Sequence, residues 1–374
     1  MNILVVTREL PPVGGGAGYV ALNLAETMAQ QGHHLHVVTM HFGELPVIEK
    51  RGRLTIYRIR CGRKNQDSSY LFEMIRFVFS AIPVARRLVN SEQCLLIHAH
   101  AIIPDALIAL CVRGRRPFVI TAHGSDVPGY NPDQFTISHR ILRPVWHAVL
   151  NSAAEIVTPS SFLASLIKRV RPDQGVARIP NGVADNFFRA DPHRVGFLIV
   201  SRLVKRKNYH LFLKALSKIP EPQSVDIVGD GPALEDLTML ASECPHHSIR
   251  FHGWLPNGSS KWKRLYESSR FLVFPSASEN FPINLLEGLA AGVLVLASDI
   301  PSNREVLEHD AVYFPSLSIE DIAATICEVL KMSDETWMEK SAEGMHRVQQ
   351  EFSWEAVTSR YLALYESILS KTDS

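Results

Sequence analysis

Two glutamates eight positions apart, Glu279 and Glu287, stand in the segment FPSASENFPINLLEGLAAG, residues 274–292. The apolar run before Glu279 predicts a buried strand, and the pattern after Pro282 predicts a helix. One carboxylate therefore follows a strand, and the other lies about two helical turns away on the same helix face. A structural explanation exists, because the helix dipole favours an acid near a helix start and glutamate is a good helix former. A functional explanation depends on what the rest of the chain supplies.

A second group of charged residues follows another predicted strand. The segment IVSRLVKRKN, residues 199–208, places Arg202 and Lys207 among four basic residues within six positions. Arginine binds phosphate through a planar fork and lysine as a point charge, so such a loop can hold a diphosphate. The alternative is an ordinary solvated turn.

Three consecutive glycines, Gly14 to Gly16, lie between the first predicted strand and a helix that we expect to begin near Ala17. Glycine lets the backbone approach a ligand closely, and a helix N-terminus offers unpaired amides to an anion. Contact with a phosphate or a sugar is one hypothesis, and a hinge or tight turn is the other. The segment matches neither the dinucleotide-binding GxGxxG pattern nor the P-loop.

Histidines end two further predicted strands. His123 precedes a glycine in VITAHGSDVPG, residues 119–129, where the carboxyl end of a strand can present a side chain to a ligand; a structural turn residue is the alternative. His98 and His100 share a strand face, as metal-ligating pairs do, but no HExxH accompanies them and we favour a buried strand. The chain has no Asp-x-Asp sequence for a nucleotide-bound cation, so no metal site is predicted.

The composition is that of a globular protein with a full core. The 374 residues are 46% hydrophobic and 21% charged, which suggests two domains of ordinary size. The net charge is +1, but residues 1–188 hold 20 basic and 13 acidic residues, and the remainder is acidic. A basic first half suggests an anionic partner, such as a phosphorylated substrate or lipid headgroups, with solvated surface charge as the alternative.

Cysteine usage and the first residues indicate the compartment. The five cysteines are scattered without a CxxC pair, which argues for a reducing environment and against disulfides or a cysteine zinc site. A strand is predicted over residues 2–7, so no signal peptide is expected. The longest strongly apolar stretch, residues 77–85, is too short to span a bilayer. We therefore expect a cytoplasmic protein.

Short apolar runs alternate with amphipathic helical patterns through the chain. In the first half, strands are predicted near residues 2–7, 34–40, 54–60, 94–98, 117–121, 155–158 and 176–179. The series restarts with strands near residues 196–200, 224–228, 248–251, 271–274 and 294–297. Strands rich in Val, Ile and Leu between helices predict parallel sheets covered on both faces. Two doubly wound α/β domains are therefore predicted, over residues 1–188 and 189–351, followed by a helix over residues 352–374. A cleft between them is the expected ligand site.

The chain resembles the retaining, nucleotide-sugar-dependent glycosyltransferases of family 4 (group 1). The resemblance rests on the order and spacing of PPVGGGAG, LAETMAQQGHHLHVVT, HAH, TAHGSD, AAEIVTPSSF, IPNGV, SRLVKRKN, IVGDGP, VFPSASENFPINLLEGLAAG and the closing FSW helix. It implies the GT-B fold, in which two Rossmann-like domains face a cleft and the C-terminal helix returns toward the N-terminal, acceptor-side domain. It also implies transfer of a sugar from a UDP- or GDP-linked donor to a hydroxyl of a glycan or glycolipid, in polysaccharide or cell-envelope glycan biosynthesis. No cofactor or metal is implied.

The resemblance assigns roles by position. Glu279 would accept hydrogen bonds from donor-sugar hydroxyls, and Glu287 from the ribose. Arg202 and Lys207 match the family's diphosphate-binding pair, whose charge stabilises the leaving group as a metal does elsewhere.

The remaining roles fall on backbone groups and one histidine. Gly15 and Gly16 would close on the diphosphate, and His123 would lie beside the reacting sugar. Amides around Asn280 and Phe281, at a helix N-terminus, would help to hold the sugar or phosphate. The acceptor hydroxyl would attack from the face that the diphosphate leaves, and a phosphate oxygen would take its proton. No protein nucleophile is therefore expected.

Four positions depart from the usual family pattern. Ser201 and Asn280 stand where glycine is common, Gly288 replaces alanine, and Val293 replaces proline. Because the charged positions are retained, these departures bear on donor identity more than on activity. The alternatives are a nucleotide-sugar hydrolase or epimerase of the same fold, a metallohydrolase using the two strand histidines, and a non-catalytic nucleotide-sugar-binding protein.

One predicted helix raises the question of a membrane. Residues 70–89, YLFEMIRFVFSAIPVARRLV, combine an apolar face with Arg76, Arg86 and Arg87. We expect an ordinary packed helix, because an apolar stripe normally faces a core. Peripheral contact with the inner face of a membrane, through the basic N-terminal domain, is the alternative. No nucleic-acid partner is predicted.

Overall fold

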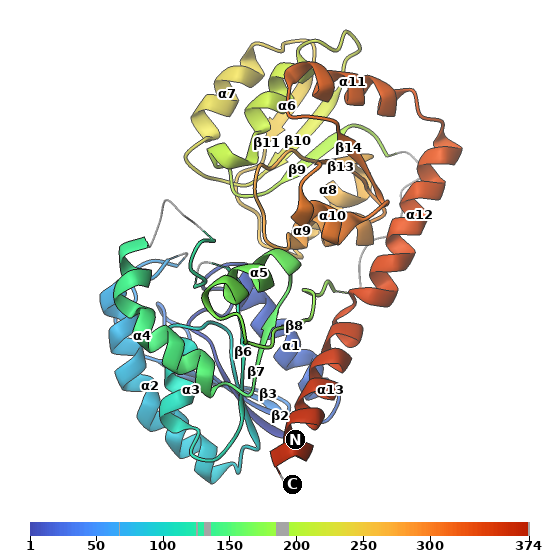
Figure 1. The fold of residues 1–374 in the computed structure, drawn as a ribbon. Coiled ribbons are helices and arrows are strands. Elements are labelled where there is room, and N and C mark those ends of the chain that lie inside the picture. Colours follow the sequence, from blue (N-terminus) through green and yellow to red (C-terminus); the bar gives the residue numbers. More distant parts are fainter. Residues whose placement is uncertain (67, 125, 131–135, 185–193, 373–374) are drawn as a thin grey trace. The chain divides into compact units, whose positions relative to one another are not determined.

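The computed structural model describes residues 1–66, 68–124, 126–130, 136–184 and 194–372 (Figure 1). The chain forms two compact units. Unit 1 comprises Met1–Asn181 together with Trp354–Ser374, and unit 2 comprises Gly182–Ser353. Each unit is an α/β structure with its own sheet, so the two mainly parallel sheets predicted from the alternating pattern are confirmed.

The sheet of unit 1 has the strand order β3-β4-β2-β1-β5-β6-β7-β8. Its strands are β1 (Asn2–Val6), β2 (His34–Met40), β3 (Ile48–Arg51), β4 (Leu54–Ile59), β5 (Leu96–Ala99), β6 (Phe118–Thr121), β7 (Glu155–Thr158) and β8 (Ala177–Arg178). Neighbouring strands are parallel except at the edge, where β3 runs antiparallel to β4. The apolar pattern did not predict β3, because its residues IEKR are mostly charged and solvent-facing.

Helices cover both faces of this sheet (Figure 1). On one face α2 (Leu71–Ser91), α3 (Asp105–Val112) and α4 (Thr136–Ser152) pack in a row; on the other, α1 (Gly16–Gln30) packs against the last helix, α13 (Trp354–Thr372). The remaining helix, α5 (Ser161–Val170), lies against β7 and β8. The end of the chain is therefore part of unit 1.

The sheet of unit 2 is parallel, with the order β11-β10-β9-β12-β13-β14. Its strands are β9 (Phe197–Val200), β10 (Ser224–Val228), β11 (Ser248–Phe251), β12 (Phe271–Phe274), β13 (Leu294–Ser298) and β14 (Ala311–Phe314). One apolar core lies on each face. The first involves α6 (Tyr209–Leu216), α7 (Leu234–Ser242) and α11 (Ile319–Leu330), and the second involves α8 (Ser260–Ser268), α9 (Ile283–Ala290), α10 (Pro301–Leu307) and α12 (Asp334–Glu351).

Two glycines let the loop after β10 lie directly against the loop after β9. Gly229 and Gly231 have φ angles of +139° and +149°. An added Cβ at Gly229 would lie 1.8 Å from the carbonyl oxygen of Ser201, and one at Gly231 would lie 2.3 Å from that of Leu203. The amide of Leu203 donates to the carbonyl of Asp230 at 2.8 Å. The basic loop after β9 is thus held by the backbone of its neighbour.

We expect Gly229→Ala to destabilise unit 2 by more than about 3 kcal/mol, because it combines an unfavourable φ with a backbone clash. The measurement is the urea midpoint of the transition of unit 2. Gly258→Ala is the control, since Gly258 also has a positive φ (+77°) but no atom of the described residues lies within 4 Å of an added Cβ. The control should cost only about 1–2 kcal/mol. Equal losses in both variants would contradict the role given to close backbone approach.

Candidate active site

A buried lysine and a buried glutamate meet in unit 2. Lys207 ends the short 3-10 turn η1 (Lys205–Lys207), and its Nζ lies 2.6 Å from Oε1 of Glu279 in the loop after β12. Each side chain is 10% exposed. Ser276 donates a second hydrogen bond to the same carboxylate oxygen. Burial lowers the pKa of Lys207, and the neighbouring Glu279 opposes that shift. The loops after β9 and β12 are therefore joined by a charge pair.

Side-chain amides fix the same loops to each other. Asn208 adopts the left-handed conformation, with φ of +58°, and donates to the carbonyl of Pro275 at 3.1 Å. Asn284, in the first turn of α9, donates to the carbonyl of Val200 at the end of β9 at 2.8 Å. Arg202 lies two residues after Val200, and its side chain is exposed. The start of α9 is thus anchored beside the loop that carries both predicted phosphate-binding cations.

Glu287 differs from Glu279 in its surroundings. It lies on α9, is 3% exposed, and accepts a hydrogen bond from the hydroxyl of Tyr266 at 3.2 Å. Burial raises the pKa of Glu287 to about 7, against the opposing effect of the Tyr266 hydrogen bond. One glutamate of the predicted pair is therefore matched to a cation, and the other is held by a neutral donor that the sequence pattern did not indicate.

Asn280 and Phe281 come immediately before α9, as the pattern predicted. Both are buried, and the ring of Phe281 packs 6.1 Å from that of Phe352 in the core of unit 2. The side chain of Phe281 therefore anchors the turn.

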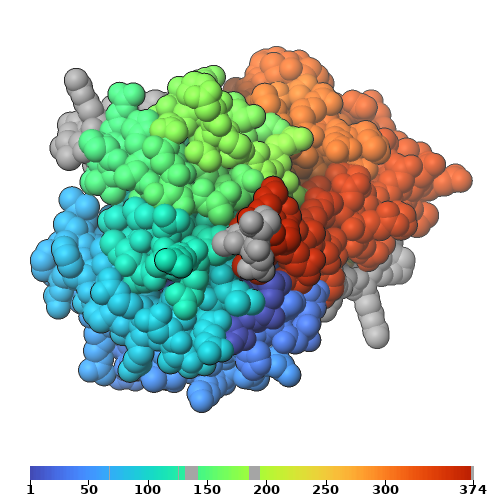
Figure 2. Space-filling view, turned by 60° about the horizontal axis from the view of Figure 1, so that its bottom comes forward, coloured from blue at the N-terminus to red at the C-terminus, as the bar shows by residue number. Residues whose placement is uncertain are grey.

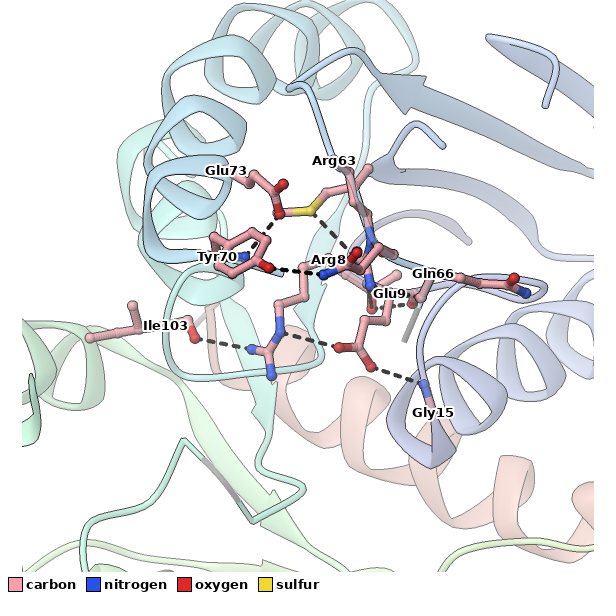
Figure 3. Close-up of polar contacts among 11 residues, drawn as sticks. Arg8, Glu9, Gly15, Arg63, Gln66, Tyr70, Glu73 and Ile103 are labelled. Carbon is pink, nitrogen blue, oxygen red and sulfur yellow. Dashed lines mark hydrogen bonds and ion pairs between the residues drawn. The ribbon is translucent and has the colours of Figure 1, made fainter. Parts of the chain in front are cut away.

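In unit 1 a carboxylate of the chain lies on the glycine-rich loop. The helix α1 begins at Gly16, and the amide of Gly15 donates to Oε2 of Glu9 at 3.2 Å (Figure 3). An added Cβ at Gly14, where φ is +90°, would lie 2.5 Å from Cβ of Glu9. Sequence reasoning missed Glu9; its acidic side chain shortly after the first strand was the available signal. The position predicted to receive an anion is thus occupied by Glu9, as the helix dipole favours.

Two arginines, Arg8 and Arg63, fix the loops around the glycine-rich segment through backbone carbonyls (Figure 3). Arg8 donates to the carbonyl of Ile103 at 3.2 Å, which ties the loop after β1 to the loop after β5. Arg63 is buried and donates to the carbonyls of Arg8 and Gln66 at 3.2 and 3.0 Å. The carbonyl of Gln66 in turn accepts from the amide of Gly14 at 2.8 Å. Arg63 therefore braces the glycine-rich loop, although no motif marked it.

His123 follows β6, and its Nε2 lies 3.2 Å from Nδ1 of His100. Burial lowers the pKa of His123 to about 4, although Asp126 acts in the opposite direction, so the imidazole is neutral at pH 7. His98 contacts Thr121 and Tyr365, each at 2.8 Å. Across the described residues, no group of three or more His, Cys, Asp or Glu side chains is arranged to hold a metal ion. His98 and His100 therefore lie in the buried interior of unit 1.

The predicted residues thus fall into one set in each unit. Unit 2 brings Lys207 and Glu279 into contact and buries Glu287 on the adjoining helix. A cavity of about 600 Å³ opens elsewhere in unit 2, at the amino ends of its strands, beside Ser224 and Ser248. Arg202, Lys207 and Glu279 instead follow the carboxyl ends of these strands, so the cavity lies at the other end of the sheet of unit 2.

Solved structures identify the fold. Sucrose-phosphate synthase from Thermosynechococcus elongatus has a TM-score of 0.81 at 19% identity, with 99% of each chain covered. Anabaena HepE in complex with UDP-glucose has a TM-score of 0.74 at 17% identity, covering 98% of this chain and 100% of that one. The chain has the GT-B fold.

Family comparisons identify the class of enzyme. Residues 14–187 match the model of Glycosyltransferase Family 4, and residues 186–344 match that of Glycosyl transferases group 1. The chain is 31% identical over 273 residues to O-antigen chain mannosyltransferase B of Escherichia coli, covering 66% of this chain and 70% of that protein. It is 23% identical over 392 residues to the GDP-mannose-dependent alpha-(1-6)-phosphatidylinositol monomannoside mannosyltransferase of Mycobacterium tuberculosis, covering 96% of each. The chain belongs to the family 4 (group 1) glycosyltransferases, and the resemblance is confirmed. It is a nucleotide-sugar glycosyltransferase.

Glu287→Gln should change how stability depends on pH. A carboxyl group whose pKa rises from 4.5 to about 7 on folding stabilises the folded state below pH 4.5, and this contribution is lost as the pH rises through 7. The variant should therefore gain stability over the parent between pH 5 and pH 8, by up to about 3 kcal/mol. Urea unfolding of both proteins at several pH values measures this difference. Glu243→Gln, which removes an exposed glutamate of the same unit, is the control. Parallel pH profiles for parent and Glu287→Gln would contradict the raised pKa.

Proposed function

We propose that the protein moves a sugar from a UDP- or GDP-linked donor to a hydroxyl of a glycan or glycolipid, with retention of anomeric configuration and without a metal ion. The observation that carries this proposal is the buried Lys207–Glu279 pair beside the exposed Arg202. A nucleoside-diphosphate-sugar presents two phosphates and several hydroxyls. Cations suit the phosphates, and a carboxylate suits the hydroxyls.

In the proposed reaction, unit 2 supplies the charged side chains that stabilise the diphosphate and position the donor sugar. The bond from the anomeric carbon to the diphosphate oxygen breaks, the acceptor oxygen bonds to that carbon, and the acceptor proton passes to the departing diphosphate. Arg202 and Lys207 would neutralise the charge that develops on the diphosphate. Within the described residues, hydrogen bonds engage Oε1 of Glu279, so Oε2 remains to accept from a sugar hydroxyl. Such a reaction needs no protein nucleophile.

The other predicted residues would complete the donor and acceptor contacts. Glu287 would accept from the ribose while Tyr266 holds its second oxygen. The neutral ring of His123 would lie beside the reacting sugar. Gly15 and Gly16 would contact the diphosphate; because the amide of Gly15 donates to Glu9, its own contact requires the Glu9 carboxylate to turn away. In this scheme residues 189–351 bind the donor and residues 1–188 the acceptor.

The names of similar proteins are consistent with either a UDP-linked or a GDP-linked donor, and with a lipid acceptor, for this chain. The mycobacterial relative is named as GDP-mannose-dependent and as acting on a phosphatidylinositol mannoside, and the Anabaena structure contains UDP-glucose. Neither identifies the donor of this chain. Thermal-shift measurements with UDP, GDP and their sugars would do so, because a ligand at 100 times its Kd stabilises by about 2.7 kcal/mol.

Arg202→Ala should lower kcat/KM for sugar transfer by about 10²–10³-fold, because it removes one charge that stabilises the leaving diphosphate. The side chain is exposed, so the fold should be unaffected. Lys205→Ala removes the same charge from an exposed neighbour and should transfer at close to the parent rate. Equal activity of Arg202→Ala and the parent would end the proposed role of this residue.

Product analysis with and without acceptor sugars separates the alternatives. Transfer that requires an acceptor supports the proposal. Full-rate sugar release or isomerisation without an acceptor would identify a hydrolase or epimerase instead. Donor binding with neither outcome would identify a binding protein.

We also propose that α2 docks on an anionic bilayer surface. The helix buries Phe77 and Leu88, as expected for a packed helix, but Phe72 and Phe79 are 65% and 73% exposed. Leu71 and Ile75 are also exposed, and so are three arginines, Arg76, Arg86 and Arg87. Figure 2 shows the sky-blue atoms of this part of unit 1 at the molecular surface. Apolar side chains beside basic ones suit the headgroup boundary of an anionic membrane. Among the described helices, none is long and apolar enough to cross a bilayer.

The double variant Phe72→Ser/Phe79→Ser should lose at least about tenfold in binding to vesicles of phosphatidylcholine with phosphatidylglycerol, since each buried phenylalanine contributes about 1.5–3 kcal/mol. Flotation at low and high salt measures this. Met239→Ser, which removes a 57%-exposed apolar side chain on α7, is the control and should bind as the parent does. Failure of the parent to float at low salt would dismiss the membrane contact and leave sugar transfer untouched.

A further inference from the structure

Three histidines lie in a row near the carboxyl ends of two neighbouring strands in unit 1, with the first pair of rings tilted by 40° and the second pair stacked. His98 lies on β5, His100 follows that strand, and His123 follows the paired strand β6. The ring centroids of His98 and His100 are 4.1 Å apart. Those of His100 and His123 are 5.5 Å apart, and the two rings lie within 12° of parallel. His98 and His100 are almost completely buried. His123 is thus backed by His100 from the interior.

One hydrogen bond joins His100 to His123. Nδ1 of His100 lies 3.2 Å from Nε2 of His123, so one nitrogen carries a proton and the other accepts it. Burial lowers the pKa of both rings. Each ring is therefore neutral at pH 7, with a single N–H.

The second nitrogen of His100 gives the direction of this bond. Nε2 of His100 is buried and has no hydrogen-bond partner among the described residues. A buried N–H without an acceptor is rarer than a buried acceptor without a donor. The proton of His100 is therefore on Nδ1, from which it is donated to Nε2 of His123. His123 then carries its own proton on Nδ1.

His98 holds the ring of His100 from the other side. Its Nε2 lies 2.8 Å from Oγ1 of Thr121, and its Nδ1 lies 2.8 Å from the hydroxyl of Tyr365 on α13. Tyr361, one helical turn earlier, contacts the same Thr121 oxygen at 3.0 Å. Because both nitrogens of His98 are engaged, its ring is fixed and supports the face of His100.

We propose that His100 is a positioning residue that sets the orientation and the tautomer of His123. The inference rests on the proposed function, in which His123 lies beside the reacting sugar. With Nε2 occupied by His100, His123 keeps its proton on Nδ1 and acts as a hydrogen-bond donor from that atom. Without the N–H of His100, Nε2 of His123 loses the donor that keeps it unprotonated, and the second tautomer becomes accessible. A sugar oxygen would then meet the donor in only a fraction of the molecules.

The tautomer can be observed without any activity. In protein labelled with ¹⁵N-histidine, a long-range ¹H–¹⁵N correlation spectrum at pH 7 distinguishes the protonated from the bare nitrogen of each ring. The signals of His123 are assigned by their loss in His123→Gln. We expect His123 of the unaltered protein to be protonated at Nδ1 and bare at Nε2.

Two substitutions of His100 separate positioning from packing. His100→Asn keeps an N–H at the place of Nδ1, whereas His100→Leu removes it. The asparagine variant should retain the tautomer of His123 and most of kcat. The leucine variant should show both tautomers and lose about 10–100-fold in kcat, with the KM for the donor nearly unchanged, as for other lost orienting partners. If His100→Leu does not fold, His100→Asn and the parent spectrum still decide the matter.

The two readouts keep this inference distinct from the proposed function. Parent-rate transfer by His123→Gln would remove His123 from the proposed reaction, while the parent spectrum would still test whether His100 sets its tautomer. A protonated Nε2 on His123 in the parent would overturn the inference. Equal loss of kcat in His100→Asn and His100→Leu, with the tautomer unchanged in both, would overturn it as well.

Discussion

A lysine ammonium 2.6 Å from a glutamate carboxylate, each nine-tenths buried, joins the two loops that matter most in unit 2. Removing two charges from water is costly, and their attraction repays that cost only with good geometry and further hydrogen bonds. Here Ser276 supplies one such bond, and Asn208 and Asn284 hold the loops in register. Well-packed apolar residues of similar volume often stabilise a protein as well as a buried ion pair does. Stability alone therefore gives no strong reason for the pair, and the proposed function would give it a role in holding the donor.

Burial acts on the three main titratable groups in the same sense, against charge. It lowers the pKa of Lys207, raises that of Glu287 to about 7 and lowers that of His123 to about 4. The groups differ in their partners. Lys207 faces a carboxylate, Glu287 faces a neutral hydroxyl, and His123 faces a second imidazole. Similar burial thus leaves Lys207 paired with a carboxylate, His123 neutral at pH 7, and Glu287 with a pKa close to physiological pH.

In the glycine-rich loop of unit 1, too, a polar group at a predicted ligand position already has a partner from the chain itself. Gly15 offers an amide at a helix start, and Glu9 satisfies it with a carboxylate from the chain itself. Arg63 keeps the loop in place through backbone carbonyls, so the loop has a defined shape with its own anion in position. An external phosphate could reach this amide only after the Glu9 carboxylate had left it.

Much of the fold was predictable from local pattern. Strands such as β9 and β12 are near-continuous apolar runs, and the glycines, prolines and charged residues that follow them mark the loops. The prediction missed two edge strands. The strand β3 has charged, solvent-facing residues that carry no apolar signal. The strand β14 is an apolar run of only four residues, and the predicted series stopped before it. Glu279, Arg202 and Lys207 could be singled out as candidates because their residue types and their place after predicted strands are readable from order alone, and Glu287 because it follows Glu279 at helical spacing.

The partners of these residues were not predictable in that way. Tyr266 lies 21 positions from Glu287, Glu279 lies 72 positions from Lys207, and Tyr365 lies 267 positions from His98. Residue order establishes which groups stand at the ends of strands, since hydrophobic periodicity is a property of neighbours along the chain. Whether each group is buried, charged or hydrogen-bonded follows from packing between distant segments, because desolvation and hydrogen bonding depend on distances in space.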